Sequence, residues 1–247
     1  MPLSRRSLLA ALLTAAPVAE AAPVLQALPP ARAPAAEPAE GQWFPLTGDD
    51  GRPVANARLP GELVSEIPEL PGLTLAGSPE PAVTLYEFFD FNCPWCRAAA
   101  RDLTGLLAGN PTLRVGLVHN AILSPGSAQA AKVALAVQRK AGSAAAFALY
   151  GALLGRSGTI DGTRALDAAR SLGHDRAAIE AEGDSDLIRR ALAAHMRLAA
   201  NLGLSATPSY VLGTTALLGH PGGRTLARVL AAVETCDSVL CEAGNPG

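Results

Sequence analysis

Aromatic residues, basic runs and long apolar stretches are scarce in this sequence of 247 residues, and each scarcity excludes a class of protein. Phe, Trp and Tyr make up only 4% of the chain, which together with abundant alanine favours helices packed on small side chains over a fold made of sheets alone. The formal net charge is -2 and no basic patch occurs, so we expect no nucleic-acid partner. No heptad pattern precedes the core, so no coiled-coil stalk is expected.

The N-terminus has the features of an export signal, and its apolar stretch is too short to span a membrane. Arg5 and Arg6 precede an apolar stretch over residues 8–19, and residues 19–21 form a small-x-small cleavage site. About a dozen apolar residues cannot cross a bilayer, which takes about 20. We therefore expect a signal peptide over residues 1–21 and a periplasmic mature protein that does not span the membrane. The paired arginines fit both twin-arginine and ordinary Sec export, so both routes stay open.

Only four cysteines are present, and an even number in an oxidising compartment favours disulfides. Cys236 and Cys241, near the C-terminus, are predicted to form a structural disulfide that closes a short loop, with a redox relay as the alternative. Cys93 and Cys96 form a Cys-x-x-Cys motif, whose main chemical use is a dithiol that cycles with a disulfide.

The predicted elements place this motif where a strand meets a helix. Residues 82–91 are rich in β-formers and almost continuously apolar, as in a strand buried on both faces. A helix is predicted over 94–108 and a second strand, parallel to the first, over 113–118. Helices are then expected over 127–141, 144–154, 162–172, 176–182 and 184–202, strands over 209–212 and 216–218, and a last helix over 223–233.

This order predicts an α/β protein with a thioredoxin fold and an inserted helical subdomain. Proline- and glycine-rich punctuation between the signal and the first strand indicates a turn and at most one short hairpin. The expected parts are a signal peptide (1–21), a disordered Pro/Ala-rich linker (22–40), an N-terminal extension (41–80), a core (81–121 and 203–235), a helical insertion (122–202) and a C-terminal tail (236–247).

The position of Cys93 predicts an acidic thiol. Cys93 is expected at the N-cap of its helix and Pro94 in the first turn, so the sulfur faces unpaired N–H groups and the positive end of the helix dipole. Both favour a thiolate and lower the pKa. Lowering a thiol pKa from about 8.5 to about 3.5 changes a reduction potential by roughly 150 mV, so thiolate stability alone can set the direction of exchange.

Other uses of the motif fit less well. A c-type haem site needs histidine after the second cysteine, and Arg97 stands there. A zinc site shared with the C-terminal cysteines and an inert structural disulfide remain as alternatives. We expect neither a metal nor a cofactor.

The segment from Glu87 to Cys96, Glu-Phe-Phe-Asp-Phe-Asn-Cys-Pro-Trp-Cys, resembles the active site of DsbA-like thiol-disulfide oxidoreductases of the bacterial envelope. The resemblance implies that Glu87 is a buried acid that moves protons for the inner cysteine, Cys96. Physical chemistry agrees, because a carboxyl in an apolar run has a raised pKa. The alternative is an edge glutamate that reaches solvent.

The resemblance also implies that Thr207-Pro208 is a cis-proline segment facing the dithiol, where the backbone, with Pro94 and Trp95, binds an extended substrate segment. An ordinary trans turn proline is the alternative. Threonine before this proline occurs in isomerases and in less oxidising members of the family. Trp95, unlike a histidine, adds no charge to stabilise the thiolate. Both features argue against the strongest oxidising potential.

The predicted function is therefore disulfide exchange with exported, cysteine-containing proteins, most simply as an oxidase recycled by a DsbB-like membrane partner. A reductase or isomerase held reduced by a DsbD-like partner, and a non-enzymatic module that binds unfolded chains or a metal, are the alternatives. Asp90 is expected to cap a loop or to turn outward. The histidines, His119, His174, His195 and His220, form no evident catalytic group.

Overall fold

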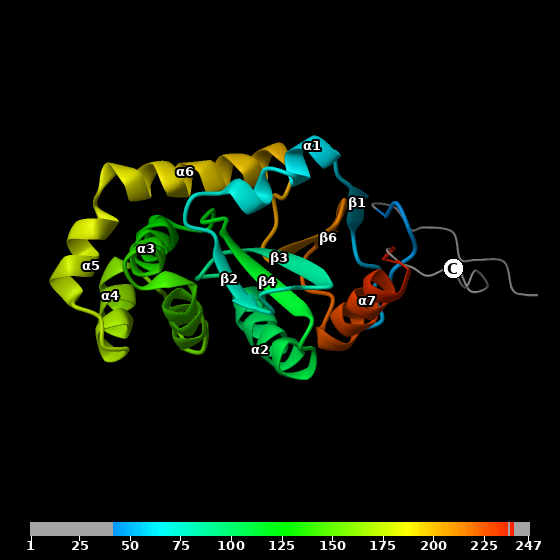
Figure 1. Ribbon diagram of the computed structural model, residues 1–247, viewed down its shortest axis with the longest axis horizontal. Coiled ribbons are helices and arrows are strands. Elements are labelled where there is room, and N and C mark those ends of the chain that lie inside the picture. The colour runs from blue at the N-terminus through cyan, green and yellow to red at the C-terminus, as the bar shows by residue number, and fades with distance from the viewer. Residues whose placement is uncertain (1–41, 237, 240–247) are drawn as a thin grey trace, which may run out of the picture. The chain divides into compact units, whose positions relative to one another are not determined.

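A six-stranded mixed sheet lies at the centre of the computed structural model, which describes residues 42–236 and 238–239. Its strand order is β1-β6-β5-β3-β4-β2 (Figure 1). The strands are β1 (Asn56–Arg58), β2 (Thr74–Gly77), β3 (Val83–Phe89), β4 (Leu113–His119), β5 (Ser209–Leu212) and β6 (Thr215–Leu218). The expected signal peptide and linker lie outside the described residues.

Strand β3 occupies the middle of the sheet, as its apolar sequence predicts. It pairs in parallel with β4, as the predicted crossover requires, and antiparallel with β5. Its alternate residues Leu85 and Phe89 face one layer of core, and Phe88 faces the other. The C-terminal part of the strand, Glu87 to Phe89, is buried, whereas Thr84 and Tyr86 are partly exposed.

From residue 94 onward the helices closely follow the sequence prediction, whereas the two short helices before it, α1 and η1, were not predicted. Two predicted helices merge into one, whose interior residue Gly142 has φ 81° and ψ 177° and marks a kink. Only glycine adopts this conformation readily, so the helix turns a corner where the sequence predicted a break. The helices are α1 (Gly61–Val64), a 3-10 helix η1 (Ile67–Glu69), α2 (Pro94–Gly109), α3 (Pro125–Leu154), α4 (Gly162–Ser171), α5 (Arg176–Gly183), α6 (Asp186–Asn201) and α7 (Gly223–Cys236).

The helices cover both faces of the sheet (Figure 1). Helices α2 and α7 pack on one face through residues such as Leu103 and Val229. The C-terminal half of α6 and η1 cover the other face, where Leu198 packs near Phe88. Helices α3, α4 and α5 gather beyond the β2 edge. The α/β thioredoxin fold with inserted helices is therefore confirmed.

The segment before the first predicted strand does more than the sequence indicates. A turn is present, closed by the bridge between Thr47 and Pro53. In addition, β1 pairs with β6 and β2 pairs with β4, so this segment supplies both edges of the sheet. Strands of three or four residues carry too little pattern to be recognised, because their partners on distant strands determine their pairing.

Two further findings concern the ends and the membrane. Cys236, the last residue of α7, is disulfide-bonded. Cys241, its expected partner, lies outside the described residues. A zinc site that uses Cys236 would first require reduction of this disulfide, because a zinc ligand is a thiolate. Within the described part of the chain, no helix combines the length and apolar character needed to span a bilayer.

Candidate active site

The loop between β3 and α2 presents the two thiols, and Asp90 holds this loop in place. The Asp90 carboxylate is buried and accepts hydrogen bonds from the N–H of Asn92 (2.7 Å) and of Leu123 (2.9 Å). Its carbonyl oxygen accepts a hydrogen bond from the Cys93 N–H (3.1 Å). Asp90 therefore caps the loop and does not turn outward, so its charge is directed to backbone donors.

Cys93 lies at the N-cap of α2 and is a free thiol. Its side chain makes no capping hydrogen bond, so the helix amides act on it as nearby dipoles. The pKa of Cys93 is lowered to about 6, and the largest cause is a hydrogen bond from the Cys96 side chain. Burial opposes this effect, and hydrogen bonds from the Thr207 side chain and from the backbone N–H groups of Cys96 and Trp95 add to it. In the thiol form its Sγ donates to the Thr207 carbonyl oxygen (3.0 Å).

Cys96 has the opposite character. It is fully buried and free. Burial raises its pKa far above the ordinary value, and its hydrogen bond to Cys93 and the nearby Glu87 carboxyl raise it further. At neutral pH the pair therefore consists of one thiolate, on Cys93, and one protonated thiol, on Cys96. This arrangement suits a nucleophile with a buried partner.

Glu87 lies in the middle of β3 and is fully buried, so the alternative of a solvent-reaching edge glutamate is wrong. Its Oε2 accepts a hydrogen bond from the Tyr150 hydroxyl (2.6 Å), and its Oε1 has no partner among the described residues. Burial, together with a smaller effect of the Cys93 charge, raises the pKa of Glu87 to about 8, although the Tyr150 hydrogen bond acts in the opposite direction. The carboxyl is therefore neutral at pH 7 and can supply a proton.

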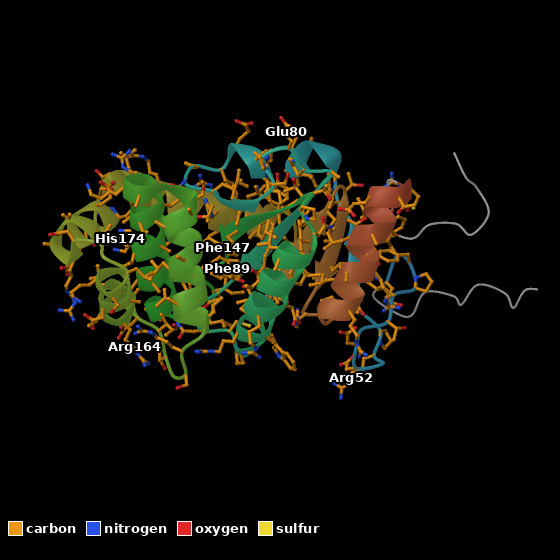
Figure 2. The ribbon with its side chains drawn as sticks, turned by 60° about the horizontal axis from the view of Figure 1, so that its bottom comes forward. Arg52, Glu80, Phe89, Phe147, Arg164 and His174 are labelled. Atoms are coloured by element: carbon orange, nitrogen blue, oxygen red, sulfur yellow. The ribbon has the colours of Figure 1, made fainter. Side chains whose placement is uncertain are left out.

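Tyr150, on helix α3 of the helical insertion, is the hydrogen-bond donor to the buried Glu87. Its ring lies between Phe89 of β3, at 5.0 Å in an edge-to-face contact, and Phe147, stacked at 5.7 Å. Figure 2 shows these two phenylalanines where α3 meets the sheet. The two rings fix the direction of the Tyr150 hydroxyl toward Glu87. The sequence gives no signal for this contact, because the partners are 63 residues apart.

The predicted substrate-binding residues lie at the same end of the sheet. The Thr207-Pro208 peptide bond is cis, and the Thr207 carbonyl contacts the Cys93 sulfur. Pro94 is exposed, and Trp95 is 65% exposed. Ile122 and Leu123, on the loop after β4, are also large exposed apolar residues, which the sequence analysis did not single out.

Asn92 joins the active-site loop to the helical insertion, and sequence reasoning gave it no role. Its side-chain amide donates to the Ile160 carbonyl (2.8 Å) and to the Ser127 hydroxyl (3.0 Å). Its Oδ1 accepts from the Ile160 N–H (2.7 Å). A single asparagine in a loop has no distinguishing pattern, so only the fold reveals this paired contact.

Replacing Asn92 with alanine is expected to destabilise the protein by about 2 to 3 kcal/mol, because it leaves both backbone groups of Ile160 unpaired. For a protein of this size, the loss lowers the melting temperature by about 5 to 10 °C. Calorimetry of the variant measures this. Asn110→Ala, at a partly exposed asparagine that bonds Glu234 near the surface, is the control, and equal shifts for both variants would contradict the role of Asn92.

Three of the four histidines have partners that the sequence did not indicate. The Nδ1 of His195 accepts a hydrogen bond from the backbone N–H of His119 (3.1 Å), and its Nε2 lies 3.0 Å from the Pro71 carbonyl oxygen. Burial lowers the pKa of both side chains, that of His195 to about 4. Both imidazoles are therefore neutral at pH 7. His220 bridges the Tyr210 hydroxyl and the Asp102 carboxylate, with 2.8 Å to each.

The bridge through His220 connects the strand after Pro208 to the helix of the dithiol. Tyr210 pairs with Glu87 across the sheet, and Asp102 is on α2. This network therefore fixes the proline segment relative to α2. Within residues 42–236 and 238–239, no group of three or more His, Cys, Asp or Glu side chains could hold a metal ion.

Comparison with known proteins gives matches to one family profile and to solved structures. The profile of DSBA-like thioredoxin domains matches residues 84–231. A thioredoxin-like oxidoreductase from Silicibacter pomeroyi DSS-3 is 31% identical, with a TM-score of 0.63, over 68% of this chain and 96% of its own. A comparison with curated proteins found no match.

Two more distant structures share the fold. The thiol-disulfide exchange protein α-DsbA2 from Wolbachia pipientis is 21% identical, with a TM-score of 0.63, over 70% of this chain and 95% of its own. A periplasmic thioredoxin-like protein from Salmonella enterica serovar Typhimurium is 20% identical, with a TM-score of 0.61, over 72% of this chain and 99% of its own.

Proposed function

This chain belongs to the family of DsbA-like thioredoxin domains and is a thiol-disulfide oxidoreductase, and we propose that it acts as an oxidase of exported proteins through Cys93 and Cys96. The observation that carries the proposal is the opposite ionisation of the two thiols. The pKa of Cys93 is lowered to about 6, while burial raises that of Cys96. A stable Cys93 thiolate favours the reduced enzyme and so drives oxidation of the substrate.

The proposed reaction starts from the Cys93–Cys96 disulfide. A substrate thiolate attacks the Cys93 sulfur and forms a mixed disulfide, and Cys96 leaves as a thiolate. This buried thiolate takes a proton from the neutral carboxyl of Glu87. A second substrate thiolate then attacks the substrate sulfur of the mixed disulfide, and Cys93 leaves as a thiolate. Two electrons pass from the substrate dithiol to the enzyme. A membrane redox partner must then take these electrons from the enzyme.

We propose that the substrate binds as an extended, weakly specified segment beside Thr207. The Thr207 carbonyl, which contacts Cys93, is the backbone group that such a segment would meet. Exposed Pro94 and Trp95, with Ile122 and Leu123 nearby in the fold, offer apolar surface that suits unfolded chains.

The proposed location is the periplasm. The expected export signal over residues 1–21 supports it, and one protein of the same fold is described as periplasmic. The proposed recycling partner is a DsbB-like membrane protein if the enzyme is an oxidase, and a DsbD-like one if it is a reductase or isomerase.

The reductase or isomerase alternative rests on Thr207 and on the moderate acidity of Cys93. Its pKa of about 6 lies between about 7 in thioredoxin and about 3.5 in the most oxidising relative. A change of one pKa unit corresponds to about 30 mV. Starting from thioredoxin, at about −270 mV, this scale gives roughly −240 mV, and starting from the most oxidising relative, at about −120 mV, it gives roughly −195 mV. The expected potential of this protein lies between these two values.

A redox titration of the mature protein in glutathione buffers, read by alkylation and mass spectrometry, decides between the two roles. The oxidase role predicts a potential at the less negative end of that bracket. A potential at about −270 mV, equal to that of thioredoxin, would overturn the oxidase proposal and support a reductase.

A further inference from the structure

A groove of about 550 Å³ lies directly beside the dithiol, between the start of α2, the start of α3 and the loop before α4. Pro94, the residue after the reacting cysteine, forms one of its walls. The remaining lining residues are Asn92, Arg97, Leu123, Ser124, Ser157, Gly158 and Thr159. The groove is therefore close enough to Cys93 to hold part of a substrate that reacts there.

The lining of the groove is cationic. Arg97 is its only charged residue, and three hydroxyl groups accompany it. No carboxylate of the described residues forms an ion pair with Arg97. Its Nη2 donates to the Gly158 carbonyl (2.6 Å), while its buried Nη1 has no partner among the described residues. Because no carboxylate of the described residues neutralises it, this guanidinium can form a charge-assisted hydrogen bond with an anion.

The surrounding backbone adds to the positive potential. Pro94 and Ser124 mark the N-terminal ends of α2 and α3, and the N-terminus of a helix attracts anions. Arg164, labelled in Figure 2, donates to the carbonyl of Thr159 and so brings a second guanidinium to the same loop (2.6 Å).

Two acids that are close in sequence to groove residues are already engaged by backbone N–H groups. Asp90 is buried and accepts from the backbone N–H groups of Asn92 and Leu123. Asp161 caps α4 by accepting from the Arg164 N–H (2.9 Å). Neither carboxylate lines the groove.

We propose that this groove binds a carboxylate that the thiol substrate carries close to its reacting cysteine. The inference rests on the proposed function. Arg97 is four residues after Cys93 on α2, about 6 Å along the helix axis. An extended peptide advances about 3.3 Å per residue, so the carboxylate belongs two or three residues from the substrate cysteine. The carboxylate takes no part in the electron transfer; it positions the attacking thiolate. Acidic peptides and a small anionic thiol such as glutathione share this chemistry.

The test compares peptides within each enzyme variant. Three peptides carry one cysteine and differ only in having Glu, Gln or Lys two and three residues from it on either side. Stopped-flow measurements give the second-order rate at which each peptide thiol attacks the oxidised enzyme. The wild type is expected to react about five to ten times faster with the Glu peptide than with the Gln peptide, because a charge-assisted hydrogen bond is made.

The variant Arg97→Gln is expected to reduce this ratio to about 1, and Arg97→Lys to retain part of it. Arg101→Gln, an exposed position on the same helix and outside the groove, changes the net charge equally and is expected to keep the ratio. Since Arg97 also holds Gly158, a purely structural role would slow all three peptides alike. Such a uniform effect would leave the ratio unchanged and overturn the inference.

The remaining outcomes separate the sources of the carboxylate and the two levels of the proposal. Preference for glutathione over its diethyl ester, without preference among the peptides, assigns the groove to a small anionic thiol. The groove assignment alone is overturned if the Glu and Gln peptides react at equal rates and both forms of glutathione do so too, with all rates above the uncatalysed rate. No reaction with any thiol overturns the proposed function as well.

Discussion

Replacing Cys93 with serine is expected to abolish thiol-disulfide exchange, with a loss of at least about a thousandfold, because an alcohol at this position cannot form the mixed disulfide. The side chain is only 4% exposed, and serine is similar in size, so the fold is expected to remain. Oxidative refolding of a reduced, cysteine-containing protein measures the loss. Refolding at the wild-type rate would contradict the role of Cys93.

The lowered pKa of Cys93 is expected to appear in the pH dependence of its alkylation. In the reduced wild type, the rate of iodoacetamide alkylation at Cys93 is expected to rise with pH around a midpoint of about 6. Cys96 is expected to stay unmodified until the protein unfolds, because it is fully buried and its pKa is raised. Mass spectrometry assigns the label to each cysteine. A midpoint near 8.5, the value of a free cysteine, would contradict the proposed mechanism.

A matched pair of variants tests the cause of the acidity. The hydrogen bond from the Cys96 side chain is the largest contribution to the lowered pKa of Cys93. Cys96→Ala removes the donor, and the alkylation midpoint of Cys93 is expected to rise. Cys96→Ser keeps a donor, and its midpoint is expected to stay closer to 6. Equal midpoints in the two variants would assign the effect to the helix amides and Thr207.

The features that the sequence predicts well are local ones. A continuous apolar run predicts the central strand β3, and Cys-Pro at its end predicts the start of α2 at Pro94. Five helices and the last two strands follow from periodicity and from breaks at glycine, serine and aspartate. The resemblance to a family adds Glu87 and the cis bond at Pro208.

The features that the sequence does not reveal join residues far apart in the chain. Glu87 and Tyr150 are 63 residues apart, Asn92 and Ile160 are 68 apart, and His220 and Asp102 are 118 apart. No periodicity records such a contact, because each partner alone is an ordinary residue of its element. The same reasoning explains the edge strands β1 and β2, which exist only because β6 and β4 offer free edges.

The stability of the protein is expected to depend on the pH through Glu87. The pKa of this carboxyl is about 8 in the folded state and 4.5 as an ordinary glutamate. Between these values the folded protein holds a proton that the unfolded chain has lost. Stability therefore falls as the pH rises through this window, by roughly 5 kcal/mol for a shift of this size. The contribution is complete below pH 4.5 and is lost above pH 8.

Cys93 titrates in the opposite sense and must be removed from the measurement. Its pKa is lowered from 9.0 to about 6 in the folded state, so the reduced protein gains stability as the pH rises through that range. The experiment therefore uses a Cys93→Ser background, in which burial, the main cause of the raised pKa of Glu87, is unchanged.

In this background, Glu87→Gln is expected to remove most of the fall in stability between pH 5 and pH 8, and to be more stable than its parent by several kcal/mol at pH 8. Glutamine keeps an oxygen to accept the Tyr150 hydrogen bond and cannot ionise. Urea unfolding at each pH gives the free energy of unfolding. Glu80→Gln, at an exposed position, is the control and is expected to follow its parent. Parallel curves for Glu87→Gln and its parent would mean that Glu87 ionises normally, and the carboxyl could then not be the proton donor to Cys96.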